Sequence, residues 1–286
     1  DGWVAYAAPG GLAFVAQLQE SRVAILPLAG GTFVHPTAIA AGPVIAGQAN
    51  DADGVTHAFV WTNGEGTRTL DAPGGGSVQV VAVNAAGHVA LNVVDETGTT
   101  RASVARPDPG AASGWAWDDI GTLCTGGVEA GCGPSSVAAS MNAAGQVVGW
   151  SVMPGGARRG FLFTRGSGVL DIGVLHPAGQ SRALMVTDDE RVLGVADMPE
   201  GMEVFVAWVR GVGLRELGHL GGDGVGLLGG ASDGRLAGFG SLEAGSQQAC
   251  ATTPLLTTCE ACRFDTVAPV IDCLSSVEVA SSEQFC

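Results

Sequence analysis

Lysine is absent from this 286-residue chain, tyrosine occurs once, and charged residues make up only 14%. The 13 basic residues are all arginines and face 28 acidic residues, so the formal net charge is −15. A field of that sign repels phosphate backbones and anionic lipid head groups. The composition therefore argues against nucleic acid and against a membrane surface as partners.

Long apolar runs are missing too, since no stretch approaches the ~20 residues of a spanning helix. Hydrophobic residues still reach 46%, which is unlike a disordered chain. The sequence starts at Asp1 without an initiator methionine or a basic leader, a pattern typical of a processed, exported protein. We therefore expect a secreted or cell-surface bacterial protein without a membrane span.

Glycine is abundant, with 46 residues against a usual ~7% of a chain. The glycines follow no Gly-X-Y period, which excludes collagen. Many short strands joined by tight turns use glycine in this way. The composition thus predicts an all-β protein.

An internal repeat indicates which kind of all-β fold to expect. Residues 135–175 hold four short apolar segments separated by turns, the first turn being Asn142-Ala-Ala-Gly145. Asn and Gly are typical of hairpin turns, because glycine accepts positive φ. The design recurs at residues 36–61, 77–94 and 183–208, about 45 residues apart, with one longer unit that contains Cys124 to Cys132. Four strands per ~40–50 residues are the signature of propeller blades.

The fold prediction is a five-bladed β-propeller. Residues 12–31 supply only a third and fourth strand and residues 224–242 only a first and second, so both chain ends would complete one blade. Six blades are the alternative, if Trp3–Ala8 and the tail add a sheet. The predicted domains are a propeller at residues 1–250 and a Cys-rich extension at 251–286.

The repeat resembles a known family. His57-Ala-Phe-Val-Trp61, the Asn-x-x-Gly-x-Val-x-Gly turns and the Leu-Gly-x-Leu-Gly-Gly segments are similar to the HAF-type probable extracellular repeats of bacterial secreted proteins. The resemblance covers about residues 10–245, and only the unit at His57 keeps the full His-Ala-Phe. It implies an extracellular location and a propeller-like repeat, and it carries no chemistry to transfer.

Cysteines gather near the end of the chain, and disulfides are the preferred interpretation over a zinc site. The tail has a Cys-x-x-Cys pair, but no histidine follows residue 219. We expect Cys124 and Cys132 to close a local loop, which leaves an odd number of cysteines and makes Cys286 a candidate for a link to a partner. The disulfide candidates are Cys124, Cys132, Cys250, Cys259, Cys262, Cys273 and Cys286.

Aromatic side chains are the candidate ligand contacts. Equivalent positions of successive units are assigned to Trp61, Trp117, Phe163 and Trp208. We expect these four to pack between blades, with a sugar-stacking ring as the alternative. Trp115 and Trp150 fall outside this position and are the candidate exposed contacts for a ligand or partner.

Metal and catalytic signatures are weak. Asp51 and Asp53 resemble the start of a calcium loop, but position 62 is threonine where such a loop needs glutamate. A hairpin turn is the preferred interpretation, so we expect no cofactor, with Ca²⁺ as the alternative. No Gly-x-Ser-x-Gly motif occurs, and the five histidines are scattered over different repeat positions. The sequence therefore predicts no catalytic residues and no enzyme.

The function that follows is a non-catalytic extracellular interaction or structural module. Its partner would be another extracellular protein or a homo-oligomeric surface assembly. The alternative is a carbohydrate-binding, lectin-like propeller that takes a glycan. A hydrolase or lyase working at the channel mouth is the third hypothesis.

Overall fold

The computed structural model describes residues 3–8, 10–17, 23–25, 28, 30–124, 133–218, 225–230, 236–241 and 247–251. These residues form antiparallel strands in six sheets, with a 3-10 turn at Pro154–Gly156 as the one helical element among them. Within the described ranges, no helix has the length and apolar character needed to cross a membrane. The expected all-β fold is confirmed.

Four sheets are complete repeats of four strands each, in chain order from the innermost strand outwards. Sheet 2 contains β4 (Val34–Ala40), β5 (Val44–Asn50), β6 (Thr56–Thr62) and β7 (Gly66–Leu70). Sheet 3 contains β8 (Ser77–Val83), β9 (Val89–Val94), β10 (Thr100–Pro107) and β11 (Trp115–Asp119). Sheet 4 contains β12 (Ser136–Met141), β13 (Val147–Val152), β14 (Arg158–Thr164) and β15 (Gly168–Asp171). Sheet 5 contains β16 (Ser181–Val186), β17 (Val192–Asp197), β18 (Glu203–Val209) and β19 (Gly213–Gly218).

The two ends of the chain build separate three-stranded sheets. Sheet 1 contains β1 (Trp3–Ala8), β2 (Leu12–Gln17) and β3 (Val23–Ile25), and sheet 6 contains β20 (Val225–Gly230), β21 (Leu236–Ser241) and β22 (Gln247–Ala251). The predicted composite blade is therefore wrong for the described strands, because no sheet joins the two ends. The physical reason is local pairing: β1 pairs along its whole length with β2, and β22 pairs with β21.

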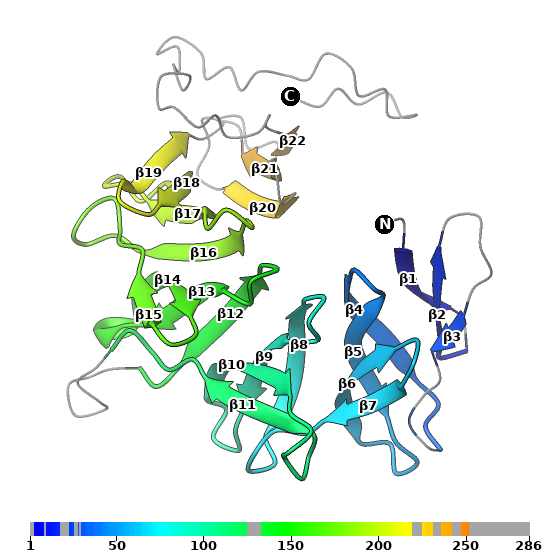
Figure 1. Ribbon diagram of the computed structural model, residues 1–286. Helices are drawn as coiled ribbons and strands as arrows, with labels where there is room; N and C mark the ends of the chain where they lie inside the picture. The colour runs from blue at the N-terminus through cyan, green and yellow to red at the C-terminus, as the bar shows by residue number, and fades with distance from the viewer. Residues whose placement is uncertain are drawn as a thin grey trace.

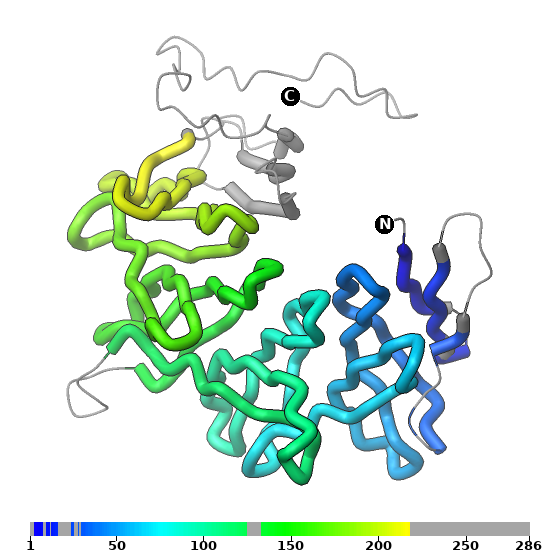
Figure 2. The backbone as a smooth tube through the Cα atoms, viewed as in Figure 1, coloured from blue at the N-terminus to red at the C-terminus, as the bar shows by residue number. Residues whose placement is uncertain are grey.

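The sheets follow one another around an arc, with β4, β8, β12 and β16 nearest its middle (Figures 1 and 2). Apolar clusters lie between consecutive sheets: one joins sheets 1 and 2, the next sheets 2 and 3, and so on to sheets 4 and 5. Because a middle strand is covered on both faces, it is apolar almost without alternation. The pattern is plain in β5, β9 and β13, whose first residues are buried without a break.

A β-bulge interrupts the innermost strand of sheets 2 to 6. Opposite the bulge of sheet 4 lies Gly149, where a Cβ atom would approach the carbonyl oxygen of Val137 to 1.8 Å. Gly194 occupies the same place in sheet 5, against the carbonyl of Arg182. In sheets 4 and 5 the glycine opposite the bulge is thus required by this close approach of two backbones. Sheet 3 has Leu91 at the equivalent position, opposite the bulge of β8.

Candidate functional site

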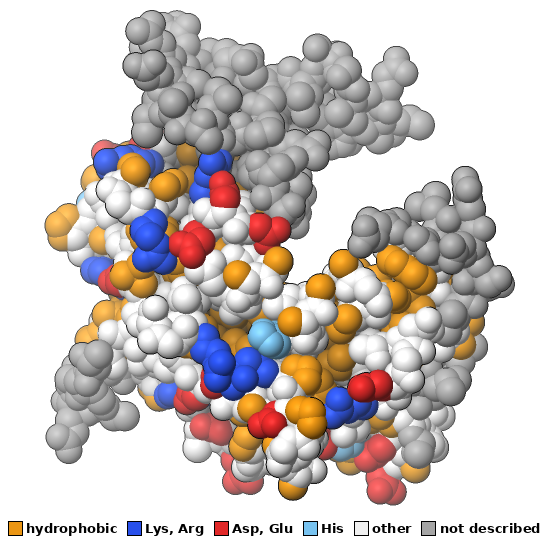
Figure 3. All heavy atoms as spheres, viewed as in Figure 1, with side chains coloured by type: hydrophobic (Ala, Val, Ile, Leu, Met, Phe, Trp, Pro, Cys, Tyr) orange, Lys and Arg blue, Asp and Glu red, His pale blue; other side chains and the backbone are white. Residues whose placement is uncertain are grey.

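The turns after the first and third strands of each complete sheet lie on one side of the arc, which we call the hairpin face. An axial cavity of about 500 Å³ opens among the innermost turns of this face. Figure 3 shows a hollow toward the middle of the molecule, with hydrophobic side chains around it. The cavity is lined by Ile39–Ala41, Val83–Ala85, Ser140–Ala143, Met185, Val186 and Asp188. Four sheets therefore contribute to one concave surface.

Asparagine side chains tie the turns around the cavity together. Asn84 Oδ1 accepts backbone N–H bonds within its own turn, while its Nδ2 donates to the carbonyl of Ala143 in the next sheet at 3.1 Å. Asn142 repeats the arrangement one sheet further on, and its Nδ2 donates to the carbonyl of Thr187 at 3.0 Å. The cavity rim is thus hydrogen-bonded from turn to turn, which makes it a pre-formed surface.

The turn of sheet 5 holds the one non-glycine residue with positive φ in the described chain, Glu190 at 63°. Sheets 3 and 4 have glycine at this turn position, Gly87 and Gly145. Glu190 accepts hydrogen bonds from Gln146 Nε2 at 2.8 Å and from Arg210 Nε at 3.0 Å. The Arg210 contact, with that of Gln146, holds the pKa of Glu190 below its usual value, so its carboxylate fastens the turns of sheets 4 and 5.

Two arginines, a histidine and an aspartate gather next to the turns that line the cavity, and we call this group the arginine site: Arg106, Arg165, His88 and Asp118. Asp118 accepts Arg106 Nε at 2.7 Å and approaches Arg165 Nε at 3.3 Å. The hydrogen bond from Arg106 lowers the pKa of Asp118, and both guanidinium charges add to the effect. Burial, followed by the charges of Arg106 and Arg165, lowers the pKa of His88. Figure 3 shows arginine and histidine side chains gathered on this face near the central hollow.

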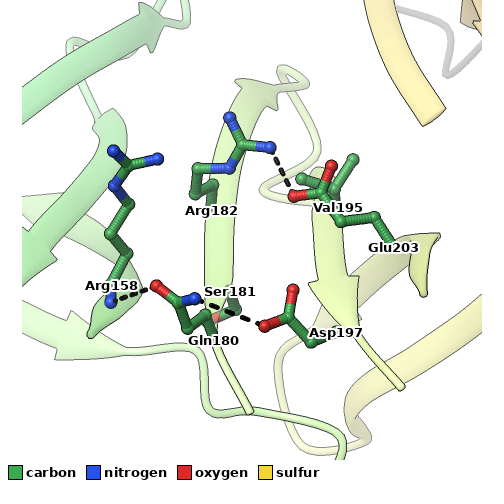
Figure 4. A pocket seen from close by; sticks show the side chains of 7 residues that line it. All are labelled: Arg158, Gln180, Ser181, Arg182, Val195, Asp197 and Glu203. Atoms are coloured by element: carbon green, nitrogen blue, oxygen red, sulfur yellow. Dashed lines mark hydrogen bonds and ion pairs between the residues drawn. The ribbon is translucent and has the colours of Figure 1, made fainter. Parts of the chain in front are cut away.

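On the opposite face, a small polar pocket lies between sheets 4 and 5 (Figure 4). Gln180 bridges it, accepting the backbone N–H of Arg158 and donating to Asp197, while Arg182 Nη2 donates to Glu203 Oε1 at 2.5 Å. Among the described residues, the guanidinium of Arg158 has no acidic partner. The other polar side chains of the pocket have hydrogen-bond partners within the chain, and the bond between Gln180 and the backbone of Arg158 connects sheets 4 and 5.

The histidine of the HAF-like motif also has internal partners. His57 Nε2 lies 3.0 Å from Asp51 and its Nδ1 2.8 Å from Asp71. Hydrogen bonds to Asp51 and then Asp71 raise the pKa of His57, and the same bond to His57 lowers that of Asp51. Sheets 3 and 4 carry arginine near this third-strand position, paired as Arg101–Asp119 at 2.8 Å and Arg159–Asp171 at 3.0 Å. A basic side chain at this position therefore links the third strand of each of these sheets to a carboxylate at the end of the fourth strand.

The calcium candidates have other roles in this loop. Asp51 Oδ1 accepts the backbone N–H groups of Asp53 and Val55, and its Oδ2 contacts His57. The described ranges contain no group of three or more His, Cys, Asp or Glu side chains arranged to hold a metal ion. The predicted turn is present at Asp51, while Ca²⁺ binding stays an untested alternative.

The tryptophan interpretation is corrected at two positions. Trp115 is only 4% exposed; its Nε1 donates to the carbonyl of Thr69 at 2.8 Å and Arg68 lies over its ring, so it packs between sheets 2 and 3. Trp117 lies on the fourth strand opposite Ala105, and Ala105 holds the third-strand position that Trp61 fills in sheet 2.

The remaining aromatic and cysteine candidates stand as follows. Trp61, Phe163 and Trp208 are buried, as the packing interpretation expects. Trp150, on β13, is partly exposed and stays a candidate contact. Cys124 is disulfide-bonded; the side chains of Cys132, Cys250, Cys259, Cys262, Cys273 and Cys286 lie outside the described part, so the predicted pairing is untested.

Sequence reasoning missed the arginine site entirely. Arg106 is the second-last residue of the third strand of sheet 3, and Arg165 begins a turn in the next repeat, 59 positions further along the chain. Charged residues at such places are usually solvated, and no spacing relates these two. Only the packing of sheet 3 against sheet 4 brings them to one carboxylate.

Comparison with known proteins supports the architecture. No family model matches the chain, and no curated protein is significantly similar to it. Among solved structures, one from a study of two prolyl endopeptidases matches with a TM-score of 0.57 and 12% identity, over 88% of this chain and 40% of that one. The fold is β-propeller-like.

Two further solved structures are similar. Prolyl oligopeptidase B from Galerina marginata has a TM-score of 0.51 and 9% identity, over 90% of this chain and 39% of that one. TolB from Acinetobacter baumannii has a TM-score of 0.47 and 11% identity, over 85% of this chain and 61% of that one. The present chain thus spans about two fifths of the length of each peptidase. At these identities the likeness concerns the fold alone.

Proposed function

We propose that this chain is a non-catalytic interaction module that docks a segment of another protein in the axial cavity of the hairpin face. The observation that carries the proposal is the cavity itself, concave, central and formed by four sheets. Its wall mixes apolar side chains such as Ile39 and Met185 with polar ones such as Ser140. A peptide segment offers both kinds of group, so it matches such a wall.

The rim adds support, because it needs little ordering on binding. Asn84 and Asn142 are 4% exposed and fix adjacent turns through bonds to neighbouring backbone. A surface whose turns are already ordered costs less conformational entropy to occupy than a mobile one. This favours docking without rearrangement of the sheets.

A secreted or cell-surface location in a bacterium belongs to the same proposal. It is supported by the resemblance of the repeats to HAF-type sequences and by the disulfide at Cys124, since disulfides persist in oxidising compartments. The carbohydrate-binding alternative receives less support. Trp61, Phe163 and Trp208 are buried, so they offer no ring of exposed stacking surfaces.

The test compares two exposed apolar residues on opposite faces. Ile39 lines the cavity and is 38% exposed, whereas Val55 lies in the β5–β6 loop and is 54% exposed. The partner is identified by mass spectrometry of the complex purified from the source and is then produced recombinantly. Ile39→Arg should weaken its binding by roughly tenfold or more, because a hot-spot contact is lost, and the matched control Val55→Arg should bind like the wild type. Equal binding by all three chains contradicts the proposal.

A further inference from the structure

We propose that the arginine site recognises a carboxylate of the docked protein segment, its C-terminal carboxylate in particular. This inference rests on the proposed docking function and adds the chemistry of the partner. The site is formed by Arg106, Arg165 and His88, with Asp118 as the fixed internal anion.

The charge balance sets this site apart. In the other arginine–carboxylate pairs of the described ranges, one arginine meets its own carboxylate, as in Arg101–Asp119 and Arg182–Glu203. At Asp118, two guanidiniums share one carboxylate. One positive charge is left over, on a chain whose formal net charge is −15. An anion placed here gains from a local field that opposes the field of the whole molecule.

Hydrogen-bond donors are available to that anion. Arg165 is 64% exposed and contacts Asp118 through Nε at 3.3 Å, so the proposal assigns its Nη donors to the ligand. Arg106 is only 18% exposed and is held by two bonds to Asp118, at 2.7 and 3.3 Å. The imidazole of His88 has no hydrogen-bond partner among the described residues, and its lowered pKa favours the neutral ring, which keeps one N–H donor. A fixed arginine, an exposed arginine and an imidazole near one carboxylate supply N–H donors of the kind that bind an oxyanion.

The site continues the cavity rather than lying apart from it. His88 closes the same β8–β9 turn whose Asn84 and Ala85 line the cavity, and the backbone N–H of Asn84 donates to the carbonyl of His88 at 3.0 Å. On the next sheet, a Cβ atom at Gly145 would lie 3.2 Å from His88 Nδ1, so the imidazole is also packed against the β12–β13 turn. None of the four members of the arginine site lines the cavity itself, and His88 is the member that adjoins the cavity-lining turns. In the proposed complex the docked segment extends past His88 to the two arginines.

The proposed ligand is a peptide segment whose terminal carboxylate follows apolar side chains. The cavity wall beside the site carries Val83 and Met141, which suit apolar side chains. A C-terminal carboxylate supplies two acceptor oxygens to the donors of the arginine site, and the peptide chain ends at the site. An internal segment would instead need an acidic side chain placed to reach these donors. Such a ligand would use both the positive charge of the arginine site and the apolar side chains of the cavity wall.

The experiment measures the affinity of the probe acetyl-Ala-Val-Leu with a free carboxylate and of the same peptide as its C-terminal amide, by isothermal titration calorimetry. We expect the acid to bind the wild type about tenfold tighter or more, because charge-assisted bonds are roughly twice as strong as neutral ones. Arg165→Gln should remove this preference. Arg158→Gln removes an unpaired arginine on the opposite face and should leave the preference unchanged.

Three results would overturn the inference: equal affinity for acid and amide, a preference that survives in Arg165→Gln, or failure of the acid to bind at millimolar concentration. Tighter binding of inorganic phosphate than of the acid, at equal ionic strength, would also overturn it and make phosphate the ligand. Failure here is separable from failure of the proposed function. If Ile39→Arg loses the protein partner while Arg165→Gln keeps it, docking in the cavity stands and carboxylate recognition is wrong.

Discussion

The imidazole of His57 lies between two carboxylates, and this local arrangement predicts a pH dependence. Its pKa is raised above the ordinary value of 6.5 by hydrogen bonds to Asp51 and then Asp71. The protonated ring is thus favoured more in the folded than in the unfolded chain. The resulting stabilisation is fully present below pH 6.5 and is lost as the pH rises through the raised pKa.

The first prediction uses Asp71→Asn, at a carboxylate that is 64% exposed. The substitution should lower the pKa of His57, because one of two stabilising carboxylates is removed. The melting temperature of the variant should fall below that of the wild type at pH about 6, and the difference should shrink as the pH rises through the folded pKa of His57. NMR titration of the His57 ring gives the pKa directly. A His57 pKa at or below 6.5 in the wild type would contradict the predicted effect of the two carboxylates.

Asn142 gives the second prediction at this scale. It is 4% exposed and its side chain bonds to Gln146 and to the carbonyl of Thr187 on the next sheet. Asn142→Ala leaves these buried groups unpaired and should cost about 2–3 kcal/mol of unfolding free energy. Asn63, exposed in the β6–β7 turn, is the control, and Asn63→Ala should change stability by less than about 0.5 kcal/mol. Urea unfolding measures both, and equal losses would show that the bond between turns is not stabilising.

Among the strands, the bulged inner strand of sheet 4 restricts what can stand opposite it on β13. Gly149 faces the bulge of β12, and a Cβ there would lie 1.8 Å from the Val137 carbonyl oxygen. Gly149→Ala should therefore force the two strands apart and cost about 2–3 kcal/mol, as overpacking does. Gly64 has open space around it, so Gly64→Ala should be close to neutral. Comparable unfolding midpoints in urea for the two variants would contradict this account of the repeated glycine.

The strands themselves were predictable where local signals repeat. Asn142 and Gly145 predicted a hairpin because both residue types are favoured in its turn, and β12 and β13 flank it. The position of Trp117 was not predictable in this way. A long turn between β10 and β11 shifts the alignment of the repeat, so that Trp117 lies one strand further out, opposite Ala105. Burial of Trp115 depends on Thr69 and Arg68 of the preceding sheet, which no local pattern shows.

At the scale of the whole molecule, the period of the repeat predicted a propeller-like arrangement and the number of complete four-stranded units. It did not predict how the ends pair, because β1 and β22 have no equivalent in the repeat pattern, and their pairing with β2 and β21 is decided by short connections. The arginine site likewise exists only between sheets 3 and 4. Sites formed between repeats are therefore invisible to a search within one repeat.

Docking of another protein can be measured by native mass spectrometry of the chain as isolated from its source. We expect a mass well above the 28.5 kDa of the chain, with a second, different protein in the complex. Repeating the measurement after reduction shows whether a cysteine links the two. A mass of 28.5 kDa with no bound protein, before and after reduction, would contradict the claim.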